Sequence, residues 1–245
     1  MKTYNFKYGH GSVSLSLNEA DILAELHGTE TPPISDIRSA LFASLEQPTD
    51  SAPLRQRVRP GDRVALVISD MTRFWMRQDL IPHLVDYLID ECGVQPEHLT
   101  IVVANGTHIG GDEQELRTLV TDGVYNRVRV KNHDCEAKDL AYLGTTPHET
   151  PVWIDRTAAE ANLVVCLGAA THHVMAGFGG GRKSILPGIS GLETIRHNHA
   201  YSLDSTKLRT NPAIGNGVLA GNPLHEDMCE AASLVNNLFM VNLVM

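Results

Sequence analysis

Three nearly unbroken apolar runs constrain the fold of this chain more than any other feature. They cover residues 63–69 (RVALVIS), 99–104 (LTIVVA) and 161–168 (ANLVVCLG). A strand needs apolar residues on both of its faces when helices cover both, so such runs are typical of buried parallel strands. The sequence therefore predicts an α/β fold, a mostly parallel sheet flanked by helices.

Weaker patterns predict the remaining elements. Apolar residues at helical spacing indicate helices, and Gly93 is well placed to end the second of them. Polar and apolar residues alternate on both sides of His10-Gly11, which indicates an N-terminal β-hairpin. The expected helices cover residues 37–45, 79–92 and 112–120, and the expected shorter strands cover residues 3–8, 12–17, 127–130, 152–154 and 234–245. We expect the last of these strands to be an edge or a tucked terminus.

Composition argues against several classes of protein. A formal net charge of −9 disfavours nucleic-acid binding, which needs a basic face. No apolar run approaches the roughly 20 residues that cross a bilayer, and residues 1–12 lack the apolar centre of a signal peptide. The four cysteines are widely spaced without a CxxC pair, which predicts reduced thiols. We therefore expect a cytoplasmic protein that binds neither nucleic acid nor membrane.

Chemically capable side chains follow each of the three apolar runs. Asp70 and Arg73 follow the first, His108 follows the second, and His173 and Lys183 follow the third. Each has an ordinary alternative explanation, such as a helix N-cap for Asp70 or a loop hydrogen bond for a histidine. Parallel sheets, however, bind ligands beyond the carboxyl ends of their strands. The placement therefore predicts one shared cleft at that edge.

The segment 172–199, HHVMAGFGGGRKSILPGISGLETIRHNH, contains a glycine-rich loop. Glycines between 177 and 181 permit sharp turns and can present free N–H groups to an anion. Neither common nucleotide motif fits, because Arg182 stands where a P-loop or a dinucleotide fingerprint needs glycine. The alternative is a tight turn that admits close packing. Because Arg182 and Lys183 adjoin the glycines, we favour an anion site, with phosphate as the expected group.

Several of the twelve histidines are candidates for chemistry. A neutral imidazole is both a common metal ligand and an acid or base near neutral pH. His108, His173 and His199 are the candidates, because each lies in or beside a predicted site loop. We interpret His133 and His148, which lie in polar loops, as structural or surface residues.

Taken together, the motifs strongly resemble the nickel-dependent lactate racemase family. They are Ser69-Asp70-x-Thr72-Arg73, Asn105-Gly106-Thr107-His108, His173-x-x-Ala-Gly-Phe-x-Gly-Gly-x-Lys183, Ile185-Leu-Pro-Gly188 and Asn198-His199. The resemblance extends over nearly all of residues 1–245. It implies a racemase or epimerase of a lactate-like 2-hydroxy acid, with proteins that synthesise its cofactor as partners.

The resemblance also implies a cofactor, the nickel-pincer nucleotide. This is a pyridinium-3-thioamide-5-thiocarboxylic acid mononucleotide, joined to Lys183 through a thioamide. His199 would complete a square around nickel with one carbon and two sulfurs, a geometry that suits Ni(II). The further residues expected to support the cofactor are Thr72, Gly179, Gly180, Gly181 and Arg182.

The same resemblance assigns roles toward the substrate. His108 and His173 would be an acid/base pair on its two faces, Asp70 would orient an imidazole, and Arg73 would hold the carboxylate. One histidine would take the hydroxyl proton while the hydrogen on C2 leaves as hydride to the cofactor. Return of hydride to the opposite face inverts the centre, which requires two bases.

Three departures from the family pattern qualify these expectations. Phe74-Trp75 stand where the family usually has proline, and with Met71 they indicate an altered or larger substrate pocket. His172 stands where proline is common, so two adjacent histidines compete for one role, and we favour His173. Relatives also carry a second, cleft-closing domain, so we interpret residues 1–245 as the cofactor-binding N-terminal catalytic domain.

Two other functions fit the same motifs. A binding module could retain the nucleotide or nickel site without turnover, because the second domain is needed to exclude water and clamp the substrate. A phosphate-binding hydrolase would use the glycine loop with neither nickel nor a lysine adduct.

Overall fold

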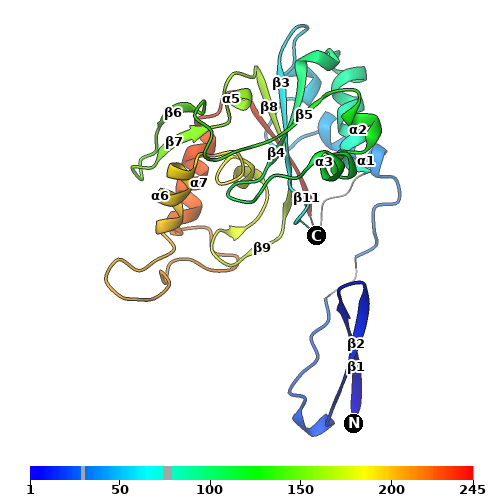
Figure 1. The fold of residues 1–245 in the computed structure, drawn as a ribbon, viewed down its shortest axis with the longest axis vertical. Helices are drawn as coiled ribbons and strands as arrows, with labels where there is room; N and C mark the ends of the chain where they lie inside the picture. The colour runs from blue at the N-terminus through cyan, green and yellow to red at the C-terminus, as the bar shows by residue number, and fades with distance from the viewer. Residues whose placement is uncertain (29–30, 74–78, 245) are drawn as a thin grey trace. The chain divides into compact units, whose positions relative to one another are not determined.

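The computed structural model describes residues 1–28, 31–73 and 79–244, in two compact units (Figure 1). Met1–Ser35 is the smaller unit, and Asp36–Met245 is the larger one. The smaller unit is built on the predicted hairpin, with β1 (Lys2–Tyr8) antiparallel to β2 (Gly11–Leu17). The register pairs Tyr4 with Leu15 and Phe6 with Val13, so one face of the hairpin is apolar.

The larger unit contains a five-stranded sheet in the order β11-β8-β3-β4-β5, and every strand pair in it is parallel. Its strands are β3 (Val64–Ser69), β4 (Leu99–Ala104), β5 (Arg129–Asn132), β8 (Leu163–Ala170) and β11 (Leu238–Val244). The predicted α/β architecture is confirmed, and the terminal apolar run supplies an edge strand. That strand begins only at Leu238, because the preceding residues complete α7 and a turn.

Helices cover both faces of this sheet (Figure 1). They are α1 (Ile37–Glu46), α2 (Leu80–Asp86), α3 (Glu113–Val120), α4 (Asp122–Tyr125), α5 (Arg156–Ala159), α6 (Leu192–Ala200) and α7 (Pro223–Ser233). Leu66 and Ile68 of β3 pack in the core formed with α1 to α4, whereas Ala65 and Val67 pack in the core formed with α5 to α7. This two-sided burial is the reason why β3, β4 and β8 are apolar at nearly every position.

Two predicted elements differ in detail from the structure. The run at 152–154 forms β7 (Pro151–Ile154), which pairs antiparallel with β6 (Ala141–Thr145) outside the central sheet. A short apolar run does not reveal its partner strand, so the sequence could not distinguish these arrangements. The helix predicted over 79–92 continues from α2 into a π-helical turn, Tyr87–Glu91, before Gly93 ends it with φ +73°.

The strand order places a topological switch beside β3. The chain runs from β3 to β4 and β5 on one side, and then crosses to β8 and β11 on the other side. Ligands of open α/β sheets bind at such a switch, outside the carboxyl ends of the strands. Within the described part of the chain, no helix combines the length and apolarity needed to cross a membrane, and the four cysteines are free.

The central strand supports a stability prediction. Ile68 is completely buried in β3, so replacing it with alanine leaves a cavity between the sheet and its helices. We expect Ile68→Ala to lower the free energy of unfolding by about 2–5 kcal/mol, measured by urea denaturation. Leu208→Ala is the control, because Leu208 is fully exposed; we expect a change within about 0.5 kcal/mol. Equal losses in both variants would contradict the assignment of this core.

Candidate active site

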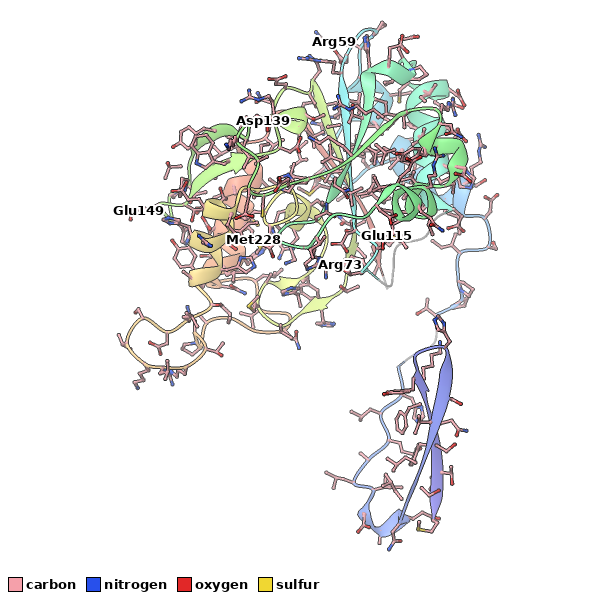
Figure 2. The ribbon with its side chains drawn as sticks, viewed as in Figure 1. Arg59, Arg73, Glu115, Asp139, Glu149 and Met228 are labelled. Atoms are coloured by element: carbon pink, nitrogen blue, oxygen red, sulfur yellow. The ribbon has the colours of Figure 1, made fainter. Side chains whose placement is uncertain are left out.

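A cavity of about 240 Å³ lies at the carboxyl ends of β3, β4 and β8. Its wall includes the side chains of Arg73, His108, His173, Lys183 and His199. The convergence expected from the strand order is therefore observed, and Figure 2 shows Arg73 at this end of the sheet. A larger hollow of about 540 Å³ lies beside β11, but the described residues that line it include no histidine or lysine. The smaller cavity is therefore the candidate active site.

Asp70 and His108 form an oriented pair at the ends of β3 and β4. Asp70 is buried, and its Oδ2 lies 2.7 Å from His108 Nδ1. Burial alone would raise the pKa of Asp70, but hydrogen bonds from Thr72 and His108 outweigh burial and lower it. An ionised carboxylate only accepts, so His108 Nδ1 donates its hydrogen to Asp70, and in the neutral ring the lone pair then lies on Nε2. His108 is therefore oriented as a proton acceptor.

His173 has the opposite arrangement. Its Nδ1 accepts hydrogen bonds from the backbone N–H groups of Met175, at 3.2 Å, and Ala176, at 3.1 Å. The hydrogen of the neutral ring therefore lies on Nε2. Burial first, and then the positive charges of Lys183 and Arg73, lower the pKa of His173 to about 4. At neutral pH His173 is an uncharged imidazole that donates a hydrogen bond from Nε2.

Lys183 lies within hydrogen-bond distance of that donor. Its Nζ is 3.3 Å from His173 Nε2, and the residue belongs to a 3₁₀ turn, η5 (Gly181–Ser184). Burial, followed by the charges of Arg182 and Arg73, lowers the pKa of Lys183 to about 8. A neutral amine can accept the His173 hydrogen, whereas an ammonium group cannot. With a pKa of about 8, Lys183 is mostly protonated at pH 7, but its fraction of free amine is far larger than that of an ordinary lysine, so it is the more reactive amine near neutral pH.

His199 offers a nitrogen that nothing else uses. Its Nδ1 is buried and has no hydrogen-bond partner among the described residues. Burial and the nearby charge of Lys183 lower the pKa of His199, so its ring is neutral at pH 7. A buried polar atom without a partner is costly unless a ligand or metal satisfies it. The adjacent Asn198 fixes this part of α6 by donating to Leu224 O, at 3.0 Å, and to Asp227 Oδ2, at 2.8 Å.

The glycine-rich loop differs from its prediction. Three of its N–H groups bond within the chain: Gly179 donates to Thr171 O at 2.7 Å, Gly181 to Asn242 Oδ1 at 2.9 Å, and Lys183 to Gly180 O at 3.1 Å. The predicted row of free amides is wrong at these positions, because tertiary contacts use them. Gly180 has φ +70°, and a Cβ there would lie 2.5 Å from Asn242 Oδ1. The tight-turn alternative therefore explains the loop better than an anion cradle.

Three of the residues predicted to contact the cofactor do not line the described cavity. They are Thr72, Gly181 and Arg182. The Thr72 hydroxyl and N–H both donate to Asp70 Oδ1, so Thr72 acts on His108 through Asp70. The Arg182 guanidinium donates to Ala176 O, at 2.7 Å, and to Gly179 O, at 3.3 Å. Arg182 therefore supports the glycine-rich loop from behind, which the adjacent basic residues in the sequence could not reveal.

The structure separates His172 from His173. His172 is exposed, with its ring centroid 5.0 Å from that of Phe178, whereas His173 faces the cavity. Phe74-Trp75, which suggested an altered pocket, lie outside the described residues. Met71 is 48% exposed and does not line the described cavity.

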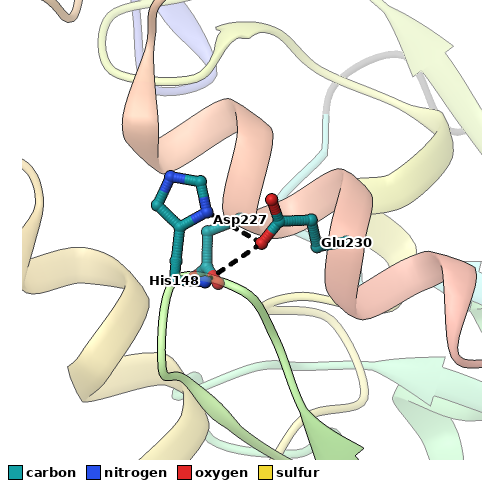
Figure 3. Close-up of side chains that lie close together, drawn as sticks. All are labelled: His148, Asp227 and Glu230. Atoms are coloured by element: carbon teal, nitrogen blue, oxygen red, sulfur yellow. Dashed lines mark hydrogen bonds and ion pairs between the residues drawn. The ribbon is translucent and has the colours of Figure 1, made fainter.

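His133 and His148 both make protein contacts, as their structural interpretation requires. His133 is buried, and its Nε2 lies 2.9 Å from Ser190 O. His148 Nδ1 lies 2.8 Å from Glu230 Oε2, close to Asp227 (Figure 3). The ligand atoms of His148, Asp227 and Glu230 lie within 4.8 Å of one another, a spacing that a metal ion could use.

Asp227 is already satisfied without a metal. Its carboxylate accepts from the hydroxyls of Thr146, at 2.6 Å, and Thr150, at 3.0 Å, as well as from Asn198. The Thr150 N–H in turn donates to the Thr146 hydroxyl. We therefore interpret this cluster as a polar contact that fixes the loop at 146–150 against α7.

Asn242 contacts the glycine-rich loop but is not among the predicted site residues. The indication of this residue in the sequence is that it is polar inside the apolar run LVNNLFMVNLVM. Nothing in that run indicates which loop the asparagine would contact, because the contact depends on β11 pairing with β8.

Comparisons with known proteins place this geometry in context. A family model described as the lactate racemase N-terminal domain matches residues 8–211. The lactate racemases of Thermoanaerobacterium thermosaccharolyticum and Lactiplantibacillus plantarum are 31% and 32% identical over 202 and 205 residues, respectively. Each alignment covers 82% of this chain and 46% of the relative, so the chain spans about half the length of these curated relatives.

Solved structures agree with the fold. The lactate racemase apoprotein from Thermoanaerobacterium thermosaccharolyticum superposes with a TM-score of 0.83 at 27% identity, covering 100% of this chain and 56% of that one. A Thermotoga maritima protein superposes with a TM-score of 0.63 at 20% identity, covering 85% and 50% of the two chains, and shares the fold.

The electrostatics of the cavity support a prediction for Lys183. Arg73→Met removes a positive charge that lowers the pKa of Lys183, so we expect that pKa to rise by roughly one unit. The measurement is the pH dependence of Lys183 labelling by an amine-reactive reagent, followed by peptide mass spectrometry. Arg59→Met is the control, because Arg59 is exposed in the turn before β3 and does not line the cavity. A Lys183 midpoint that stays at its wild-type value in Arg73→Met would count against this account.

Proposed function

Since the chain belongs to the lactate racemase family, through that family's N-terminal domain, we propose that it is the cofactor-binding part of a 2-hydroxy-acid racemase or epimerase. The observation that carries the proposal is the pair of imidazoles, His108 and His173, on the wall of one cavity. His108 presents a lone pair, and His173 presents an N–H. Inverting a carbon centre requires proton-transfer groups on two sides of the substrate.

Four residues of this chain have separate roles at the substrate. His108 takes the hydroxyl proton at Nε2, and Asp70 stabilises the imidazolium that forms. Arg73 holds the substrate carboxylate, since among the described residues it is the one that brings a guanidinium to the cavity wall. His173 donates a hydrogen bond from Nε2 to the substrate oxygen. For His173 to exchange a full proton, the backbone at 175–176 must release Nδ1, because a neutral ring cannot lose its only hydrogen readily.

The chemistry of the residues on the cavity wall supports the nickel-pincer nucleotide that we propose as cofactor. His199 has a buried nitrogen without a partner among the described residues, as a nickel ligand needs, and the lowered pKa of Lys183 increases its fraction of reactive free amine near neutral pH. Gly179 and Gly180 on the wall lack side chains that would occupy the space. Lys183 would hold the cofactor covalently, and His199 would bind its nickel. When bound, the cofactor would supply a reversible acceptor for the hydrogen on C2.

A second candidate function follows from the length of the match. The chain spans about half of its curated relatives, so the rest of such a protein would supply further substrate contacts and cover the cavity. Water exclusion and substrate clamping contribute to turnover in closed active sites. Residues 1–245 alone would then bind the cofactor without racemising a substrate.

One experiment separates these possibilities. We expect the chain, coexpressed with cofactor-synthesising enzymes, to gain nickel and a mass adduct at Lys183, and to racemise at least one of a panel of D-2-hydroxy acids. The Lys183→Arg control keeps a positive charge but cannot form a thioamide, so we expect no adduct. An adduct without turnover supports the binding module. A chain that gains neither nickel nor an adduct would contradict both the racemase and the binding module, and would favour a phosphate-binding hydrolase.

The Asp70–His108 pair provides a separate test. Asp70→Asn can present an amide N–H to His108 Nδ1, which favours the wrong tautomer, so we expect kcat to fall by roughly 10²–10⁴-fold. Nickel content and the Lys183 adduct should be unchanged. His172→Ala is the control, because His172 is exposed, and we expect its kcat to match the wild type. If Asp70→Asn keeps wild-type kcat, Asp70 does not orient the base.

A further inference from the structure

The turn that carries Lys183 is hydrogen-bonded to the last strand of the described chain. The 3₁₀ turn that carries it begins at Gly181, whose N–H donates to Asn242 Oδ1 at 2.9 Å. Asn242 lies on β11, 61 residues further along the sequence. Two residues after that hydrogen bond, Lys183 Nζ lies 3.3 Å from His173 Nε2. A movement of Gly181 would therefore be transmitted directly to the amine.

The packing around Asn242 depends on two glycines. A Cβ at Gly180 would lie 2.5 Å from Asn242 Oδ1, and a Cβ at Gly168, the register partner of Asn242 on β8, would lie 3.0 Å from it. A Cβ at Gly180 would force the amide to shift, and one at Gly168 would crowd it, so glycine at both positions leaves room for the amide to reach the loop. The loop, β8 and β11 meet at this one side chain.

The choice of asparagine at this position is otherwise unfavourable. Asparagine is depleted in strands, and the other residues of β11 (LFMVNLV) are apolar. Asn242 is exposed, so burial does not account for it. Its hydrogen bond to the loop is the contact that explains a polar side chain here. The residue also lies beyond residues 8–211, the part that the family model matches.

We propose that Asn242 is a positioning residue for Lys183, which fixes the lysine-bearing turn so that the amine stays beside His173. The proposal rests on the proposed function only in giving Lys183 its role as the attachment point. Without the Asn242 acceptor, the turn loses its tether to the sheet, and the amine gains access to water. Its pKa then moves back toward the ordinary value of 10.5.

The test measures the cofactor-free chain. In Asn242→Ala, we expect the pH midpoint of Lys183 labelling to rise from about 8 by roughly one unit, so that labelling at pH 8 falls several-fold. Amide hydrogen exchange at Gly181 should also become faster. Asn242→Asp keeps an oxygen acceptor, so we expect slow exchange at Gly181 to be preserved. Asn242→Leu repeats the test with a side chain of similar size if the alanine variant does not fold.

The matched control is Asn237→Ala. Asn237 also tethers β11, by accepting hydrogen bonds from Arg57 at 3.0 and 2.7 Å, but it does not contact the glycine-rich loop. Weakening β11 in general should therefore leave the Lys183 midpoint near that of the wild type. An unchanged midpoint in Asn242→Ala, or an equal rise in Asn237→Ala, overturns the proposal.

The outcome is independent of turnover. Cofactor loading gives a second readout: we expect the fraction of chains with a Lys183 adduct to fall several-fold in Asn242→Ala relative to Asn237→Ala. If the wild-type chain gains no adduct, the proposed function fails, but the labelling comparison still decides the role of Asn242. If the wild type loads and both variants load equally, the positioning role fails alone.

Discussion

Parallel pairing of β3 with β4 and β8 is the constraint on which the site depends. It brings the ends of three strands to one edge, although they are separated by up to about a hundred residues of chain. Asp70 follows β3, and His108 follows β4. The strand β8 leads into the segment that carries His173 and Lys183. Without that common edge, these side chains would have no cavity in common.

The second constraint is electrostatic. Arg73, His173, Lys183 and His199 lie around one small cavity, and burial disfavours a charge on each of the last three. The nearest buried carboxylate, Asp70, is already committed to His108 and Thr72. The cavity therefore lowers the pKa of its bases instead of neutralising them with acids. It holds neutral nitrogen lone pairs and an electropositive wall, which suit a metal and an anionic substrate.

Much of this organisation was predictable from sequence, for physical reasons. Strands buried on both faces, such as 63–69 and 161–168, are apolar at nearly every position, and parallel strands end at one edge. The position of the site at this edge of the sheet was therefore predictable from local sequence patterns. Three features could not be predicted from local patterns: the partner of β7, the hydrogen bonds of Arg182 and the contact of Asn242. Each depends on segments that meet only in the folded chain.

The glycine-rich loop shows why such contacts matter to chemistry. Its N–H groups at Gly179, Gly181 and Lys183 bond to the protein, so they contribute rigidity in place of anion binding. An anion in the cavity must then be recognised by the cationic side chains, chiefly Arg73 and Lys183. A covalent bond at Lys183 would remove one of these charges, which the rigid loop cannot replace. In the function that we propose, Arg73 would consequently be the described cation left to hold the substrate carboxylate, and attachment of the cofactor would itself define where the substrate binds.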